Sequence, residues 1–259
     1  MEINADNYAY RMQLANDMLM LKHSLEKVSI ESTSLNKAIK DLKNNSYLPV
    51  SNEIVATPFN WGYKIENLII HINDYDGIQY PKAKNIHRLK ITLDVNIIGE
   101  YTNDKETVID PFKHLEFNLT AEGFNSKEKY HVFSYHLDRH IDIGNKPEEI
   151  HPIYHIQVGG RRMDKQDGRN YGNSLLLDSP RIVHYPMDLI LGIDFITSNF
   201  APKLWKALRK DQSYVRLLIK SQKLAIAPFI KSLSQYFKLI GRTERCWKAT
   251  DIFPQLINS

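Results

Sequence analysis

The chain has little of what identifies many classes of protein. Its 259 residues include a single cysteine, Cys246, so an internal disulfide is excluded and nothing indicates an oxidising compartment. No run approaches the roughly 18–20 consecutive apolar residues that a membrane-spanning helix requires. The first residues lack the basic start and apolar stretch of a secretory signal. We therefore expect a cytoplasmic protein with no membrane contact.

Several well-known catalytic motifs are also missing. The sequence has no Walker-type phosphate loop, no dinucleotide-binding glycine fingerprint, no paired-cysteine zinc pattern and no His-Glu-x-x-His. No serine or cysteine lies in a recognisable nucleophile elbow. These absences disfavour ordinary nucleotide-dependent chemistry and hydrolysis by a serine or cysteine nucleophile.

Positive charge is concentrated near the C-terminus. Residues 201–248 contain twelve Lys or Arg against two acidic residues, a balance of +10 in a chain whose total is +4. At helical spacing, six of these cations form two stripes. They are Lys203, Lys206 and Lys210, then Arg216, Lys220 and Lys223. The stripes predict an anionic partner, either nucleic acid or an acidic protein, and the alternative is a solvated helix face.

Residues 8–44 are predicted to be helical. Apolar residues recur at alternating spacings of four and three from Leu14 to Leu42, with Ser32 in the one polar slot. The stretch from Ser29 to Ser34 has low helix propensity and favours a break into a helical hairpin. We interpret this heptad seam in two ways: packing within the chain, or a coiled coil with a second copy or another partner.

From Tyr63 to Ile182 apolar and polar residues alternate, which is typical of half-buried strands. Six strands are predicted, near 63–73, 87–101, 114–122, 129–141, 150–158 and 174–178. Because most connections between them are short, the strands are expected to form an antiparallel sheet with one apolar face.

Helices are predicted after residue 186 and are expected to cover the apolar face of the sheet. The first begins at Pro186, and others span 201–210 and 212–237, with Pro228 bending or dividing the last. The fold class is therefore α+β. Residues 1–45 are interpreted as a helical segment for association, 46–185 as the sheet and 186–259 as basic helices packed on it. Residues 46–259 are expected to form one domain.

The sharpest chemical signal is a histidine-rich hairpin in residues 128–160, which contain five of the ten histidines. A turn centred between residues 145 and 146 pairs residues whose numbers sum to 291. Two opposed pairs result: His140 with His151, and His136 with His155. Asp138 lies midway on the same face. Residues four apart on a strand are about 13 Å apart, so the four histidines do not share one metal ion.

Three interpretations of this cluster are open. A metal site would use His136, Asp138 and His155 with a divalent ion such as Zn, Mn, Fe or Ni, helped by Glu116 or Asp94 from neighbouring strands. Metal-free acid–base catalysis on a phosphodiester would use the histidines and Asp138. Its candidate catalytic residues are His136, Asp138, His140, His151 and His155, with Arg161 and Arg162 holding phosphate. The third interpretation is structural, with hydrogen-bonded histidines on a half-polar sheet face.

The histidine-rich hairpin ends in Gly-Gly-Arg-Arg and is followed by SPRIVHYPMDLILGIDFI, a Ser-Pro-Arg turn and an apolar helix. This combination, over about 128–200, resembles uncharacterised bacterial proteins of mobile-element and phage-defence islands. It is also similar to some small toxins of toxin–antitoxin pairs in placing a His-x-x-x-His-type pattern on a sheet. The resemblance implies a cytoplasmic defence or toxin-like component that works with partners, and it assigns no catalytic residue.

We therefore expect an accessory subunit of a bacterial nucleic-acid-related complex that acts in anti-phage defence. Its N-terminal helices would mediate association, and its basic C-terminal helices would bind DNA, RNA or an acidic protein. The alternative is a hydrolase, a ribonuclease-like toxin that cleaves phosphodiester bonds at the histidine cluster. A third hypothesis is a small-molecule binder that uses the polar sheet face.

Overall fold

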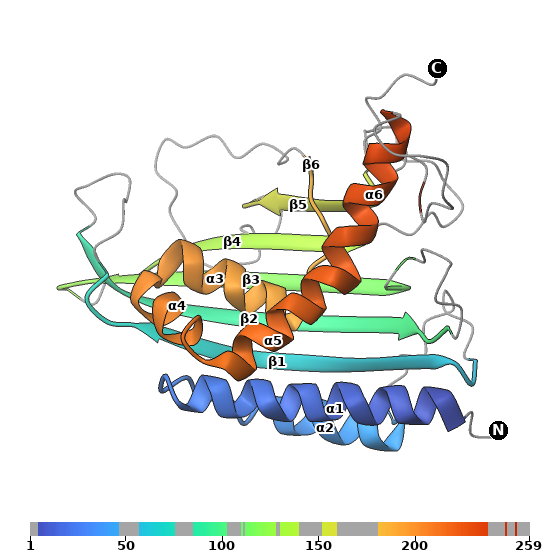
Figure 1. Cartoon of the computed structure of the whole chain (residues 1–259). Helices are drawn as coiled ribbons and strands as arrows, with labels where there is room; N and C mark the ends of the chain where they lie inside the picture. The colour runs from blue at the N-terminus through green and yellow to red at the C-terminus, as the bar shows by residue number, and fades with distance from the viewer. Residues whose placement is uncertain are drawn as a thin grey trace.

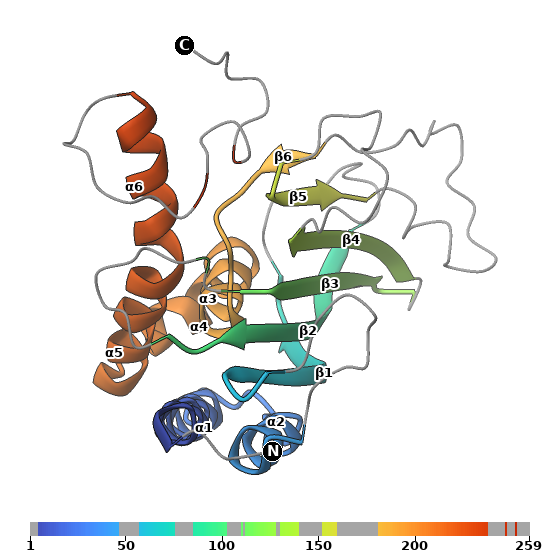
Figure 2. The same ribbon diagram turned by 90° about the vertical axis from the view of Figure 1, so that its right-hand side faces the viewer.

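The computed structural model describes residues 5–46, 57–75, 85–102, 110, 112–127, 130–139, 152–159, 181–237, 247 and 252. An antiparallel sheet lies beside an N-terminal helical hairpin, and the C-terminal helices cover one of its faces (Figure 1, Figure 2). The α+β class is thereby confirmed. Within these ranges, no helix has the length and apolar character needed to cross a bilayer.

The N-terminal segment forms the predicted hairpin, with helices α1 (Ala5–Glu26) and α2 (Leu35–Asn44). Ser29, in the turn between them, has a left-handed φ of 60°. Arg11 of α1 is buried, and its Nη1 donates to the carbonyls of Leu42 and Lys43 at 2.7 and 3.3 Å. Because the last turn of a helix leaves its carbonyls without helical partners, this guanidinium stabilises the end of α2.

The heptad seam packs inside the chain. Its members Met18, Leu21, Leu25, Leu35, Ile39 and Leu42 all belong to the buried core. Packing within the chain therefore accounts for the period of the seam. A homo-oligomer or a coiled-coil partner formed through other surfaces of α1 stays a prediction.

Among the described residues, six antiparallel strands form a meander in chain order. They are β1 (Asn60–Ile72), β2 (Ile86–Glu100), β3 (His114–Asn125), β4 (Tyr130–Arg139), β5 (Tyr154–Val158) and β6 (Ile182–Val183). The first five match predicted ranges to within four residues at either end. The predicted strand at 174–178 lies outside the described residues.

Alternation along the strands separates an apolar face from a polar one, as the period of two predicts. Phe117 of β3 is fully buried beneath helix α3 (Leu189–Phe200), and the next residue, Asn118, points to the opposite face. The contact with α3 is close: a Cβ added at Gly192 would lie 2.1 Å from Cε2 of Phe117. Glycine at this position therefore lets the helix layer approach the sheet.

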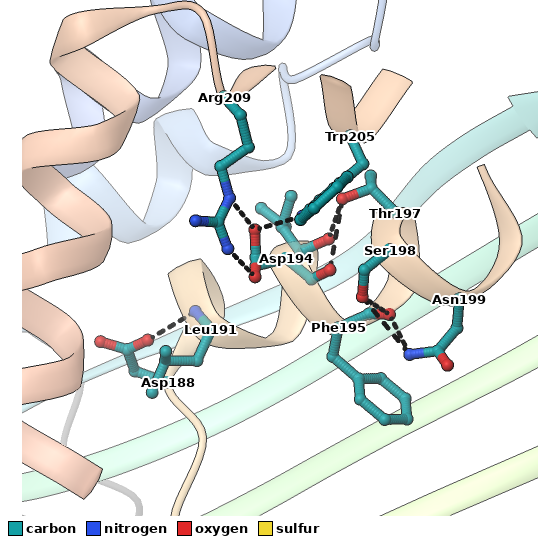
Figure 3. A network of polar contacts seen from close by, with 10 residues as sticks. Asp188, Leu191, Asp194, Phe195, Thr197, Ser198, Asn199, Trp205 and Arg209 are labelled. Atoms are coloured by element: carbon teal, nitrogen blue, oxygen red, sulfur yellow. Dashed lines mark hydrogen bonds and ion pairs between the residues drawn. The ribbon is translucent and has the colours of Figure 1, made fainter. Parts of the chain in front are cut away.

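Helix α3 begins at Leu189, three residues after the predicted start at Pro186. The side chain of Asp188 accepts the N–H of Leu191 at 2.9 Å, so Asp188 is the N-cap. Helix α4 (Pro202–Leu208) follows directly. On α3, Asp194 accepts Nε and Nη2 of Arg209 at 3.0 and 2.7 Å and Nε1 of Trp205 at 3.0 Å (Figure 3). This network fixes α4 and the turn after it on α3.

The last helical region is one continuous helix with a widened turn. Helix α5 (Gln212–Ser221) runs into the π-helical turn η3 (Gln222–Ile226) and then into α6 (Ala227–Tyr236). Pro228 has no N–H for the carbonyl of Leu224, and just before it the N–H of Ala227 bonds to the carbonyl of Gln222, five residues back. Pro228 was predicted to bend or divide this helix, and the structure shows an undivided helix with a local π turn just before Pro228.

Candidate functional site

The histidine cluster lies on the sheet face that points away from the helices. His136 and Asp138 flank Leu137 on β4, and Leu137 is fully buried, so the two polar side chains project to the other face. His155 pairs with Asp138 in the ladder, and Gln157 pairs with His136. The predicted opposition of His136 and His155 is therefore wrong by two residues. Because side chains alternate with a period of two, this shift leaves every side chain on its predicted face.

The Asp138 carboxylate joins two imidazoles. Its Oδ2 lies 2.8 Å from Nε2 of His136, and its Oδ1 lies 2.9 Å from Nε2 of His155. The other ring nitrogens also have partners: Nδ1 of His136 lies 2.6 Å from Oδ1 of Asn118, and Nδ1 of His155 lies 3.1 Å from the carbonyl of Pro152. We call Asn118, His136, Asp138 and His155 the His–Asp network. It links β3, β4 and β5.

The electrostatics of the network favour an ionised carboxylate. Burial alone raises the pKa of Asp138, but hydrogen bonds from His136 and His155, together with their positive charge, hold that pKa well below its ordinary value. His155 has an acceptor near each ring nitrogen, the Asp138 carboxylate at Nε2 and the carbonyl of Pro152 at Nδ1. The network thus combines the hydrogen bonds of His136 with a close ion pair between Asp138 and His155.

The same geometry bears on catalysis. A general acid or base must present a ring nitrogen to its substrate. In the His–Asp network each nitrogen of His136 and His155 already has a protein partner, and their side chains are only 14% and 1% exposed. This arrangement favours the structural interpretation of the cluster over the catalytic one.

The metal interpretation gains no support from this arrangement. The Asp138 carboxylate contacts both imidazoles directly. Across the described ranges, no group of three or more His, Cys, Asp or Glu side chains is placed to hold a metal ion. The further ligands that were considered have other contacts. Glu116 accepts Nδ2 of Asn96 at 3.4 Å, and Asp94 accepts the N–H of Asn67 at 2.8 Å.

Part of the predicted site lies outside the described residues. This applies to His140 and His151 of the catalytic set, and to Arg161 and Arg162 of the phosphate site. Their roles stay predictions.

A second polar cluster nearby was not predicted. Tyr154 donates its hydroxyl to Oδ1 of Asp110 at 2.5 Å, and Nε of Arg139 donates to Oδ2 at 2.8 Å. Tyr154 is fully buried, and its ring packs edge-on against Trp247 at 5.9 Å between centroids. Asp110 precedes β3, and no repeating pattern in the sequence relates it to residues on β4 and β5. The sequence therefore carries no local signal for this contact.

The six predicted cations of the basic helices do not share one role. Lys203, Lys206, Lys210, Arg216 and Lys223 are exposed, and no ion pair to a described carboxylate involves them. Lys220 is different, because its Nζ bonds the carboxylate of Asp17 on α1. Lys220 thus fixes α5 to the N-terminal hairpin, and we remove it from the predicted anion-binding surface.

Apolar side chains accompany the cations on the long helix. Ile219 and Ile230 are 46% and 52% exposed. They line a shallow groove together with Lys223, Ile226 and Lys231. We define the outward helix face as Arg216, Ile219, Lys223, Ile226, Ile230 and Lys231. From Arg216 to Ile230 the spacings of three and four keep these residues on one side of the helix, and Lys231, which directly follows Ile230, lines the same groove.

Searches of family models, curated proteins and solved structures found no match to this chain.

Proposed function

We propose that the chain is an accessory, partner-binding subunit of a bacterial nucleic-acid-related complex in anti-phage defence, and that it docks an acidic protein segment on the outward helix face. The observation that carries the proposal is the mixture of exposed isoleucines and cations there. Exposed apolar patches flanked by charge are typical of protein-binding surfaces. The context of phage defence comes from the sequence resemblance alone.

The mixture of side chains also distinguishes between the two anionic partners. A phosphate backbone is bound mainly by cations, and exposed isoleucines contribute little to it. An acidic amphipathic helix would use both kinds of side chain, since its apolar stripe buries Ile219 and Ile230 while its carboxylates face Arg216 and Lys231. We therefore favour the acidic protein over nucleic acid.

A defined peptide tests the proposal. We expect an acidic amphipathic helix of Leu and Glu to bind the full chain in fluorescence anisotropy. Replacing Ile219 and Ile230 together by serine should weaken binding about thirtyfold, because roughly 1 kcal/mol of apolar burial is lost at each half-exposed position. Arg216→Glu with Lys231→Glu should weaken binding to a similar extent.

The matched control is Lys203→Glu with Lys206→Glu on α4, which changes the same charge outside the outward helix face and should leave peptide binding intact. Duplex DNA and single-stranded RNA are measured in parallel over a range of salt. If only nucleic acid binds, and the α4 variant weakens it while the serine variant does not, nucleic acid is the partner and the acidic-protein proposal is overturned.

The phosphodiester hydrolase is a second candidate, favoured by one observation: His136, Asp138 and His155 do lie together. Cleavage of a ribonucleotide homopolymer by the purified chain tests it. We expect the His136→Ala variant to show the same cleavage as wild type, because both ring nitrogens of His136 are engaged by Asn118 and Asp138. A loss of activity of a hundredfold or more would establish the catalytic interpretation instead.

A further inference from the structure

A cavity of about 330 Å³ lies where α1, β1, the start of α3 and the junction of α5 with η3 meet. Its wall is mainly apolar, with Leu14 and Met18 from α1, Ile190 from α3 and Leu224 from η3. At about 30 Å³ for each water-sized group, such a volume holds roughly ten non-hydrogen atoms. Apolar cavities with a few polar groups are typical sites for small molecules.

Two carboxylates and two ammonium groups surround the cavity, and only one of these four has neither a hydrogen bond nor an ion pair with another described residue. Asp17 and Lys220 pair with each other. Asp188 accepts the hydroxyl of Ser221 at 2.6 Å and also caps α3. Lys223 is exposed and takes part in no ion pair within the described ranges. The ammonium group of Lys223 is therefore the charged group at the cavity that is open to a ligand, whereas Asp188 is held by hydrogen bonds and has no cation partner among the described residues.

The buried end of the cavity disfavours the charged forms of the ionisable groups that line it. Burial raises the pKa of the Asp188 carboxyl, with a further contribution from the charge of Asp17, and burial also raises the pKa of the Tyr63 hydroxyl. Burial at this cavity therefore disfavours the charged form of both groups. A ligand with one charged end would place its apolar part inside and its charge at Lys223.

The backbone of the π turn η3 places the ammonium group of Lys223 next to the apolar wall of the cavity. Lys223 and Leu224 are consecutive residues of the π turn η3, and both line the cavity. Single π turns inside helices occur frequently at functional sites. Here the widened turn brings an ammonium group and an apolar side chain to the same cavity.

We propose that this cavity binds a small aliphatic carboxylic acid of about eight to ten carbon atoms. The chain lies against Leu14, Met18 and Ile190, and the carboxylate pairs with Lys223. An alcohol of the same length would keep the apolar contacts and lose the ion pair. An amine of the same length would meet a like charge at Lys223.

The test uses octanoate and octan-1-ol as a matched pair, each below its aggregation concentration, in calorimetric titrations of the full chain. Octanoate is expected to bind saturably and about fivefold more tightly than octanol, the upper end for a partly exposed ion pair. Lys223→Gln should raise the Kd for octanoate about fivefold and leave the Kd for octanol unchanged. The control Lys206→Gln on α4 should change neither.

Leu224→Trp fills the cavity and should abolish the binding of both ligands while circular dichroism shows a folded chain. If that variant does not fold, Ile190→Phe fills the cavity from the opposite wall and takes its place. The proposal is overturned if octanoate shows no saturable binding to wild type, or if a folded, filled variant still binds it. It is also overturned if Lys223→Gln weakens both ligands equally, since Lys223 then does not recognise the carboxylate.

Discussion

Replacing Gly192 by alanine is expected to lower the free energy of unfolding by about 2 kcal/mol. In an exposed helix the same change is stabilising by about 1 kcal/mol, because alanine has the higher helix propensity. At Gly192 the sign reverses, since the new Cβ would lie 2.1 Å from Cε2 of Phe117 and 3.0 Å from its Cζ. Phe117 is fully buried, so its ring has no open space to enter. Urea unfolding followed by circular dichroism measures the change.

A double-mutant cycle with Phe117→Leu identifies the cause. Leucine removes the ring atoms that the new Cβ would meet, so Gly192→Ala should be much less destabilising in the Phe117→Leu background. We expect a coupling free energy of about 1–2 kcal/mol in favour of the double variant. Additive effects of the two changes would show that the alanine acts elsewhere than at this contact.

This contact matters beyond the core because α3 carries the rest of the helix layer. Asp194 on α3 binds both Arg209 and Trp205 (Figure 3). Helix α5, which carries part of the outward helix face, begins three residues after Arg209. The sheet thus positions the proposed docking helix through α3. A weakened contact between Gly192 and Phe117 should therefore also reduce acidic-peptide binding, in proportion to the fraction of chain that is unfolded.

The sequence predicts much of this fold because each element has a period of its own. The strands alternate with a period of two, the heptad seam has a period of seven, and Ser29 lies where helix propensity falls. These signals are local, so they do not depend on how the elements meet. The start of α3 differs from the prediction, because a proline favours the first helical position and so indicates Pro186, whereas Asp188 provides the cap.

In the histidine hairpin, the periodic pattern predicts the face of each side chain but not the register of the strands. Strand period decides which face His136, Asp138 and His155 occupy, and that prediction is correct. Register depends on the turn between the strands, which period does not determine, and it was wrong by two residues. The result is chemically different, since His155 now faces a carboxylate instead of another imidazole.

Contacts between segments that are distant along the chain could not be predicted from the sequence. Lys220 belongs to a helical stripe of cations, and only the packing of α5 against α1 shows that Asp17 neutralises it. Asp110 reaches Arg139 and Tyr154 in the same way, from a position that precedes the sheet strands they lie on. The cavity between α1 and η3 likewise depends on surfaces of four separate elements.

Replacing Asp138 by asparagine is expected to lower the free energy of unfolding by about 2 kcal/mol near pH 6. The change keeps the shape of the side chain and removes the charge that both imidazoles contact at 2.8 and 2.9 Å. The pKa of Asp138 is lower in the folded chain than in the unfolded one. Its contribution is therefore fully present above the unfolded pKa of about 3.9 and is lost as the pH falls through the folded value.

Urea unfolding of wild type and Asp138→Asn between pH 6 and pH 2.5 tests this prediction, and the difference between them should shrink below about pH 4. Glu116→Gln is the matched control, because Glu116 lies opposite Asp138 in the ladder and is half exposed, so its loss should change stability by less than about 0.5 kcal/mol.

The sign of the Asp138 effect also separates the two interpretations of the network. Active-site groups commonly cost stability, so a catalytic carboxylate is often replaced with no loss of stability or with a gain. A stable Asp138→Asn variant that has lost phosphodiesterase activity would therefore assign the network to catalysis, whereas a destabilised one with unchanged partner binding assigns it to the sheet that supports the docking helix.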